Sequence, residues 1–396
     1  MSIDNRTMKT FWISGLLLTV FITITACNKD DASTAAVQLP EECNGVSASR
    51  ISADIEDQYI ILFEEPDIIN GRQLSLRETI GNLFAQYRIQ ENAVLQINDG
   101  LLKSCVVKID RGQYNSLRKS KQIVAIEPDK IYTLATCFTI VEPRLVTWNI
   151  KRVGYADGRG KTAWIIDTGI DFTHPDLNVD IERSKSFVKE ENSASDYNGH
   201  GTHVAGIIGA LNNSIGVLGV ASGAKLVSLK VMNDKGSGNL SFIINALAHL
   251  ETAAKQGDVV NLSFGADGTS DILDRYVTSI ASKGVYFSIA AGNEETNASK
   301  SSPARVNAPN VFTVSAIDSL DRFADFSNYG NDVVDFAGPG VQIISTYSNG
   351  RYAKLSGTSM AAPHIAGLLL LNGRNIKTAG FAKSDPDGEA DKIGGN

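Results

Sequence analysis

Cysteine is scarce in this chain and absent from most of it. The four cysteines, Cys27, Cys43, Cys105 and Cys137, all precede residue 138 of 396, and no Cys-x-x-Cys pair occurs. The sequence therefore argues against a thiolate zinc site or a thiol redox motif. After Cys27, a disulfide from Cys43 could reach Cys105 or Cys137, and the spacing does not choose between them.

The chain also lacks an excess of basic charge. Lys and Arg number 37 against 44 Asp and Glu, which gives a net charge of -7 and a pI near 5.4. No basic field would gather a polyanion, so we expect no nucleic-acid partner. The hydrophobic share of 43% over 396 residues is enough for more than one domain, one of them with a large core.

The one apolar run of note, residues 11–26, is shorter than the roughly 20 residues that span a bilayer. Arg6 and Lys9 precede it, which predicts a signal peptide over residues 1–26 and export. The run ends Ile24-Thr25-Ala26-Cys27, which resembles the lipobox of bacterial lipoproteins, and the next residues, 28–31, resemble a signal for transport to the cell surface. We expect lipidation of Cys27 and a membrane-anchored precursor; the alternative is a plain secretory signal.

A change of texture divides the remaining chain. Residues 27–57 are polar and aperiodic, as in an exposed tether, and residues 58–135 read β-α-β-β-α-β, the ferredoxin-like order. The strands and helices expected there are 59–63, helix 74–88, 93–97, 101–109, helix 113–119 and 123–126. This region contains no histidine and is too small to be a convincing enzyme.

From residue 145 onward, short apolar runs alternate with helical segments. The expected strands are 163–166, 226–231, 259–262, 285–289 and 311–314, and the expected helices include 203–211 and 240–255. Such alternation is typical of α/β proteins with a mostly parallel sheet covered on both faces. Functional residues then belong at the carboxyl ends of the strands.

Three glycine-bearing motifs carry candidate chemistry. They contain Asp167 (residues 165–171), His200 (198–206) and Ser359 (357–363). Taken singly, the aspartate could begin a turn, the serine could cap a helix, and the histidine with His203 could bind a metal. The histidine motif lacks the i, i+4 pair and the glutamate of HEXXH, so we interpret His203 as structural.

In this order, Asp167, His200 and Ser359 closely resemble the subtilisin family of serine proteases over about residues 145–371. The resemblance implies a three-layer α/β fold with a mostly parallel sheet in a catalytic domain at 136–396. It also implies that residues 58–135 are an inhibitory propeptide, which the enzyme cuts near Ala135-Thr136.

The resemblance assigns roles to single residues. His200 acts as general base for Ser359, Asp167 orients His200, and Asn293 donates to the oxyanion together with the backbone of Ser359. It implies broad specificity for polypeptide substrates, with Glu294 close to the pocket for the residue before the cleavage point. The residues expected to bind substrate are Gly236, Ser237, Gly238, Ser263, Phe264, Gly265, Ala290, Ala291 and Gly292.

A structural calcium ion is expected from the same resemblance. Residues 211–217 match the calcium loop of secreted subtilisins, and Asp176 occupies the position of its carboxylate. Calcium prefers six to eight oxygen ligands. The expected ligands are Asp176, the Asn213 side chain and the carbonyls of Leu211, Ile215 and Val217.

The last 25 residues, after Leu371, show no helix periodicity, so we expect a short acidic tail with a solvated Asp385–Asp391 stretch rather than a second calcium site. The expected protein is a monomeric, autoprocessed endopeptidase. Lipid on Cys27 would anchor the propeptide at the outer membrane or cell surface and leave the mature domain free outside the cell. Rival interpretations are a surface lipoprotein that binds peptides without cleaving them, and a dedicated maturation protease.

Overall fold

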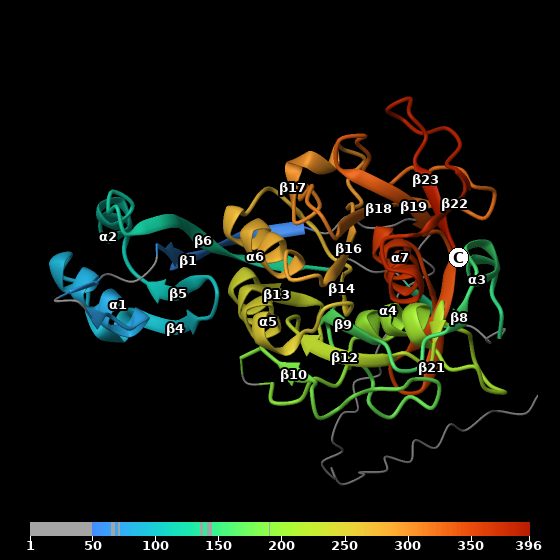
Figure 1. The fold of residues 1–396 in the computed structure, drawn as a ribbon, viewed down its shortest axis with the longest axis horizontal. Coiled ribbons are helices and arrows are strands. Elements are labelled where there is room, and N and C mark those ends of the chain that lie inside the picture. Colours follow the sequence, from blue (N-terminus) through green and yellow to red (C-terminus); the bar gives the residue numbers. More distant parts are fainter. Residues whose placement is uncertain (1–49, 65–67, 70–71, 135–137, 141–144, 190) are drawn as a thin grey trace, which may run out of the picture. The chain divides into compact units, whose positions relative to one another are not determined.

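The alternating apolar runs form the strands of a large central sheet. Figure 1 shows the fold as a computed structural model, which describes residues 50–64, 68–69, 72–134, 138–140, 145–189 and 191–396. The predicted signal peptide, Cys27, Cys43 and Cys137 lie outside these residues. We call residues 50–134 the N-terminal domain and residues 145–396 the C-terminal domain.

The central sheet of the C-terminal domain has nine strands in the order β10-β12-β9-β14-β16-β18-β19-β23-β22. Every neighbouring pair is parallel except β22–β23, which confirms the predicted mostly parallel sheet. The bounds are β9 Thr162–Asp167, β10 Lys185–Ser186, β12 Lys225–Lys230, β14 Val259–Leu262, β16 Tyr286–Ala290, β18 Val311–Ile317, β19 Val334–Pro339, β22 Lys377–Phe381 and β23 Lys392–Gly395.

Helices cover both faces of this sheet (Figure 1). Alternate side chains of β9 point to opposite faces, so Ala163 and Ile165 pack with α4 and α7, and Trp164 and Ile166 pack with α5 and α6. The arrangement is the expected three-layer α/β fold. The helices are α3 Trp148–Val153, α4 His200–Gly209, α5 Leu240–Ala253, α6 Asp271–Ala281 and α7 Thr358–Asn372.

The N-terminal domain has the predicted ferredoxin-like order. Its sheet runs β6-β1-β5-β4 with antiparallel neighbours, and β13 (Ser237–Asn239) of the C-terminal domain adds a fifth strand beside β6. Ser75 with Glu78, and Asp110 with Gln113, form capping boxes that start its two helices. The elements are β1 Arg50–Phe63, α1 Leu76–Gln86, β4 Val94–Asp99, β5 Lys103–Lys108, α2 Arg111–Leu117 and β6 Ile123–Thr133.

Shorter elements complete the chain, and the described residues of both domains belong to one compact unit. The shorter elements are β2 Ile68–Ile69, β3 Arg72–Gln73, η1 Glu91–Ala93, β7 Phe138–Ile140, β8 Ala156–Asp157, β11 Ala221–Ser222, β15 Ala266–Asp267, η2 Ala298–Lys300, β17 Ser301–Ser302, β20 Ile343–Tyr347 and β21 Arg351–Leu355. None of the helices among the described residues has the length and apolar character needed to cross a membrane.

Two expectations for the N-terminal region change. The tether was expected to continue to residue 57, but β1 begins at Arg50, where polar residues pair with the end of β6. Backbone pairing, rather than apolar periodicity, forms this part of the strand. Cys105 is a fully buried free thiol, so the disulfide between Cys43 and Cys105 that the spacing allowed is not formed.

The expectation of a short acidic tail with a solvated Asp385–Asp391 stretch holds only in part, because residues 385–390 are exposed or half-buried but Asp391 is buried. Residues after α7 form β22 and β23, and β23 lies parallel to β19 at the edge of the central sheet. Asp391, just before β23, is buried and accepts a hydrogen bond from the Ser315 hydroxyl. The strands were missed because they are short and polar, and β22 is an edge strand whose side chains are mostly exposed.

Asp391 makes stability depend on pH. Its burial, reinforced by the charges of Asp385, Asp387 and Asp335, raises its pKa to about 7. Because this folded-state pKa exceeds the unfolded value of about 3.9, the stabilisation is complete below the unfolded pKa and is lost as pH rises through about 7. Asp391→Asn should therefore melt at a higher temperature than the parent at about pH 9, and the gap should shrink towards about pH 4.

Differential scanning calorimetry of the Asp391→Asn protein, in a Ser359→Ala background that removes any self-digestion, measures this gap. Glu389→Gln changes an exposed carboxylate of the same loop and is the matched control. A melting-temperature gap that stayed constant across the pH range would contradict the assignment.

Candidate active site

The three candidate residues stand at the carboxyl edge of the sheet. Asp167 is the last residue of β9 and is fully buried. Its Oδ1 accepts a hydrogen bond from the Thr168 backbone N–H at 2.7 Å, and its two oxygens lie 2.8 and 3.0 Å from Nδ1 of His200. A carboxylate without solvent keeps its charge only with such donors, so Nδ1 of His200 carries a proton and donates it to Asp167.

His200 is the first residue of α4 and is buried. In a neutral imidazole with its Nδ1 proton directed to Asp167, Nε2 is the acceptor, and this atom has no hydrogen-bond partner among the described residues. The next residue must be glycine, because a Cβ at Gly201 would lie 2.1 Å from the carbonyl oxygen of Gly169. The helix can thus approach the end of β9 closely enough for the Asp167–His200 contact.

A second buried carboxylate, Asp196, holds the start of α4. It accepts hydrogen bonds from the backbone N–H groups of Gly199 and Thr202 and from the hydroxyls of Thr202 and Thr168. The Thr168 hydroxyl in turn accepts from the backbone of Gly201. Sequence reasoning missed Asp196, although an aspartate four residues before His200 and six before a helical threonine is a capping signal that could have found it.

Ser359 is the second residue of α7, the helix that packs against α4. The first backbone N–H groups of a helix have no partner within it, and they carry partial positive charge. The Ser359 carbonyl accepts a hydrogen bond from the Ser263 hydroxyl at 2.8 Å. Ser263 follows β14, which pairs with β9 up to Leu262 and Ile166, so Ser359 lies one strand from the end that holds Asp167.

Pro363 accounts for the Ser263 contact. An α-helix bonds each carbonyl to the N–H four residues later, and a proline at position 363 has no N–H for the carbonyl of Ser359. A buried carbonyl without a donor would cost about 1–3 kcal/mol. Ser263 supplies the missing donor from the neighbouring strand end, and it thereby fixes Ser359 against β14.

Asn293 lies on the loop after β16, next to the start of α7. Its Oδ1 accepts hydrogen bonds from the backbone N–H of Thr358 at 2.8 Å and from the Thr358 hydroxyl at 3.0 Å. These two contacts fix the amide with its oxygen towards Thr358. Its Nδ2 forms no hydrogen bond with another described residue, so this donor is free for a ligand. The side chain is 9% exposed, which leaves this donor at the edge of the buried site.

The loop that carries Asn293 is closed by Glu294 and Asn328. Oε2 of Glu294 accepts from the backbone of Asn293 and from Nδ2 of Asn328, and Oδ1 of Asn328 accepts from the backbone of Glu294 and Thr296. Gly292 sits between them at a φ of 108°, where a side chain would be strained and would strike Asn328. The Glu294 carboxylate therefore turns inward and braces this loop.

The expected substrate-binding residues lie on three neighbouring segments. Gly238 and Ser237 belong to β13, which pairs with Tyr132 and Thr133 of β6, and the Gly236 carbonyl accepts from the Leu134 N–H at 2.7 Å. The other segments are Ser263, Phe264 and Gly265 after β14, and Ala290, Ala291 and Gly292 at the end of β16. A Cβ at Gly265 would lie 3.9 Å from Cα of Gly292, so these last two segments are adjacent.

Of the residues expected to bind calcium, Leu211, Asn213 and Val217 donate N–H hydrogen bonds to Asp176, and the Ile215 N–H donates to Oδ1 of Asn213. Oδ1 of Asp176 accepts from Nδ2 of Asn213 at 2.9 Å, and its Oδ2 accepts from the Val217 N–H at 2.9 Å and the Tyr352 hydroxyl at 3.3 Å. Burial raises the pKa of Asp176 to about 6. The loop Leu211 to Val217 thus wraps one carboxylate that forms no ion pair with a basic side chain among the described residues.

The remaining motif histidine is structural. His203 is fully buried, its Nε2 donates to the carbonyls of Ile343 and Ala353 at 3.0 and 3.1 Å, and burial lowers its pKa to about 3. The neutral His203 imidazole therefore joins α4 to β20 and β21. Across the described residues, no group of three or more His, Cys, Asp or Glu side chains is placed to hold a metal ion.

This geometry can activate a hydroxyl. An imidazole oriented by a buried carboxylate, with an unprotonated Nε2, accepts a proton from a nucleophile, and a helix N-terminus with a side-chain amide stabilises an oxyanion. These are the parts of an acyl-transfer site.

Comparison with known proteins supports the same conclusion. The chain is 38% identical over 336 residues to M-protease of Shouchella clausii, covering 82% of this chain and 83% of that protein. It is 47% identical over 234 residues to Subtilisin Savinase of Lederbergia lenta, covering 57% and 83% of the two chains. The crystal structure of a cold-adapted subtilisin-like serine proteinase superposes with a TM-score of 0.56 at 34% identity, over 63% of this chain and 98% of that one.

The match to the family itself spans residues 158–376, and it includes all three motifs and the loop of Asn293. More than half of the chain is covered, and the fold is the one that the motifs imply. The chain therefore belongs to the subtilase family and is a serine protease of the subtilisin type.

Proposed function

We propose that this protease is an exported endopeptidase, made as an autoprocessed zymogen, in which Ser359 forms an acyl-enzyme. The observation that carries the proposal is the buried Asp167–His200 pair, whose Nε2 has no partner among the described residues, together with Ser359 at the N-terminus of α7, which packs against α4. A protein that only binds peptides has no need of a buried carboxylate–imidazole pair. The alternative of a non-cleaving lipoprotein is therefore disfavoured.

The reaction follows from the proton positions. His200 takes the proton of Ser359 as its oxygen attacks a peptide carbonyl, and the imidazolium that forms is stabilised by Asp167. The negative oxygen of the tetrahedral intermediate is bound by the Asn293 amide and the backbone N–H of Ser359. His200 then protonates the leaving amine, and water hydrolyses the ester by the same steps.

The N-terminal domain supports the zymogen proposal. β6 lies against β13 in the way that an extended substrate would add to this edge, and main-chain pairing of this kind depends little on sequence. The backbone N–H of Leu134 donates to the Gly236 carbonyl, so the pairing with this edge reaches the last residue before the proposed cleavage region. The proposed cleavage near Ala135-Thr136 lies outside the described residues.

Two acidic side chains of β6 attach the N-terminal domain to helices of the C-terminal domain. Oδ1 of Asp129 accepts from the Ser241 N–H at 2.9 Å in the first turn of α5. Oε1 of Glu127 accepts from the hydroxyl of Ser270, the N-cap of α6, at 2.6 Å. Carboxylates at helix N-termini are stabilising, because they satisfy free N–H groups and favour the helix dipole.

Specificity is proposed to be broad, with one apolar preference. Tyr132 of β6 is buried, and its ring makes an edge contact with Phe264 at a centroid distance of 6.3 Å. A substrate that replaced β6 would place a side chain against the Phe264 ring. Large apolar residues two positions before Leu134, that is, at the Tyr132 position, are therefore favoured.

Export with a lipid on Cys27 remains a proposal from the sequence. The lipid would be on the N-terminal side of the cleavage point, so processing would release the mature domain from the membrane. Identification of a diacylglyceryl cysteine by mass spectrometry of the Ser359→Ala precursor would support lipidation.

A structural calcium is proposed at the Asp176 loop. The carboxylate, one amide and three carbonyls are hard oxygen donors suited to calcium, and the buried carboxylate has no basic partner among the described residues. Asn213 would have to present its oxygen rather than its nitrogen. Such an ion would neutralise Asp176 and join residues 211–217 to it, which stabilises the folded domain.

The triad proposal predicts the loss of turnover in variants. Ser359→Ala should lose about 10⁶ in kcat and Asn293→Ala about 10²–10³, magnitudes taken from subtilisin, which is the reference case for both effects. Hydrolysis of casein and of a peptide anilide, with and without a serine-directed phosphonate, measures this. Wild-type rates in purified Ser359→Ala would contradict the mechanism.

The zymogen proposal predicts that the cleaved N-terminal domain inhibits and that Asp129 contributes to binding. Losing a helix cap costs about 0.5–2 kcal/mol, so Asp129→Ala should weaken inhibition about 2- to 30-fold. Activity of the processing mixture over time, together with the N-terminal sequence of the mature enzyme, measures both effects. Asp99→Ala, which removes an exposed ion pair with Lys103, is the control.

The calcium proposal predicts that a chelator lowers the melting temperature of the mature, phosphonate-inhibited enzyme by several degrees, because a bound ion stabilises by mass action. Asp176→Asn should melt lower and lose most of this response. If excess chelator left the wild-type melting temperature unchanged, no structural calcium is bound.

A further inference from the structure

A fully buried lysine lies next to Asp167, at the end of the neighbouring strand. Lys230 is the last residue of β12 and stands opposite Asp167 in the parallel register with β9. Its side chain is 1% exposed. A buried ammonium group is costly unless it is paired and hydrogen-bonded, so its partners are expected to be fixed in position.

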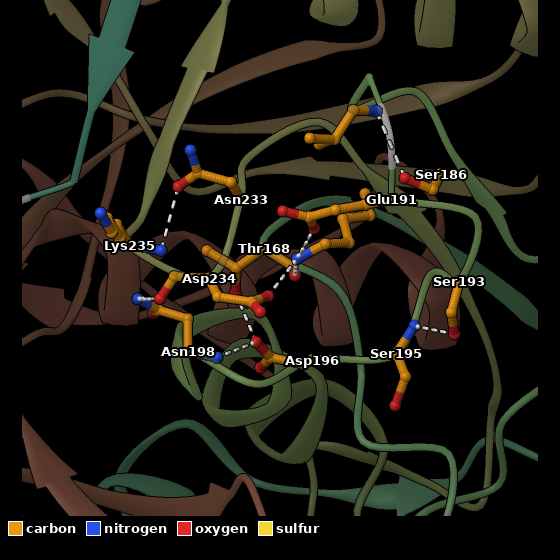
Figure 2. A network of polar contacts seen from close by, with 12 residues as sticks. Thr168, Ser186, Glu191, Ser193, Ser195, Asp196, Asn198, Asn233, Asp234 and Lys235 are labelled. Atoms are coloured by element: carbon orange, nitrogen blue, oxygen red, sulfur yellow. Dashed lines mark hydrogen bonds and ion pairs between the residues drawn. The ribbon is translucent and has the colours of Figure 1, made fainter. Parts of the chain in front are cut away.

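Lys230 gathers three separate segments. Its Nζ donates to the Thr168 carbonyl at 2.6 Å and lies 3.1 Å from Oδ1 of Asp234 and 3.2 Å from Oε2 of Glu191. Thr168 follows β9, Asp234 lies in the turn after β12, and Glu191 lies in the loop after β10. Figure 2 shows Glu191 and Asp234 on different loops, with Thr168 between them.

The Asp234 turn is the part of this network that leads into β13, the proposed substrate edge. Asn233 closes the turn, since its Oδ1 accepts from the N–H groups of Lys235 and Ser237, and its backbone pairs with Ser237 and Gly236 (Figure 2). The Asp234 carbonyl also accepts from Nδ2 of Asn198, two residues before His200. The turn is therefore rigid, and it continues directly into β13.

The other end of the network is the triad backbone. The carbonyl of Asp167 accepts from the N–H groups of Val231 and Met232, and the next carbonyl, that of Thr168, accepts from Lys230. Backbone hydrogen bonds join β12 to β9 up to Lys230 and Asp167, where both strands end. After these residues, among the contacts above, only the Lys230 ammonium links Thr168 to the Asp234 side chain.

We propose that Lys230 is a positioning residue that holds the β13 edge in register with the Asp167–His200 pair for extended substrates. The inference rests on the proposed role of Gly236–Gly238 as a substrate edge. Its consequence is a dependence on substrate length. A peptide with four residues before the cleaved bond pairs with β13 and needs this register, whereas a single-residue ester does not reach it.

The experiment compares two substrates in the mature enzyme. One is a tetrapeptide anilide, and the other is an N-acetyl amino-acid ester with the same residue before the cleaved bond. Misplacement by about 1 Å can cost about 10²-fold, so Lys230→Met should lower kcat/KM for the tetrapeptide about 10- to 100-fold, mainly through KM, and that for the ester much less. Lys230→Arg, which keeps the charge, should recover part of the loss.

Lys225→Met is the matched control, because Lys225 begins the same strand and its half-exposed side chain pairs with Asp180 at 3.6 Å. It should keep the wild-type ratio of the two rates. Asp234→Asn, at a half-exposed partner, tests the same link if Lys230→Met does not fold, and should lower the tetrapeptide rate in the same direction. The double variant Lys230→Met with Asp234→Asn should be no worse than Lys230→Met.

An unchanged ratio in Lys230→Met and Asp234→Asn, or an equal loss on both substrates, would overturn the inference. Failure of the proposed function gives a different result, since wild type would then cleave neither substrate.

Discussion

The rest of the site depends on keeping the Asp167 carboxylate charged without water. Removing such a group from solvent costs several kcal/mol unless donors replace the lost hydration. The donors are the Thr168 backbone and the His200 imidazole, and both must approach closely. This requirement places His200 at the first position of α4 and a glycine directly after it, because any side chain at residue 201 would collide with the chain that follows β9.

Asp196, a second buried carboxylate, needs hydrogen-bond donors for the same reason. It accepts hydrogen bonds from Thr202 at the start of α4 and from Thr168 at the end of β9. Burial raises the pKa of Asp196, and the charge of Asp167 adds to that shift. Thr168 donates to both carboxylates, from its backbone N–H to Asp167 and from its hydroxyl to Asp196. Helix α4, which presents the His200 imidazole, is therefore held by hydrogen bonds that join its first turn to the end of β9.

Sequence reasoning reached the parts of this design that depend on local pattern. The apolar runs placed β9, β12, β14, β16 and β18 within one or two residues at their starts, and the motifs located Asp167 and His200. Helix α4 was expected from residue 203, because glycines at its start obscure the periodicity. Lys230 was missed, since its partner Thr168 is distant in sequence and nothing local distinguishes a buried charged residue from a solvated one. Asp196 was missed although two of its partners, Gly199 and Thr202, are local.

The C-terminal strands were missed for a related reason. β22 and β23 carry little apolar periodicity, and they form because β19 offers an open edge. The acidic residues between them were predicted to be solvated, yet Asp391 is buried and accepts a hydrogen bond from the Ser315 hydroxyl. Tertiary partners, rather than composition, decide whether such a segment is a tail or a strand.

Helix α7 shows how an apolar segment can present a polar atom. Residues 358–370 are all buried, so the helix runs through the core with Ser359 in its first turn. Pro363 removes one internal hydrogen bond, and the carbonyl so released binds Ser263 after β14. A helix defect is thereby converted into a tie between the nucleophile and the strand beside Asp167, so the sheet edge sets the position of Ser359 as well as that of its partners.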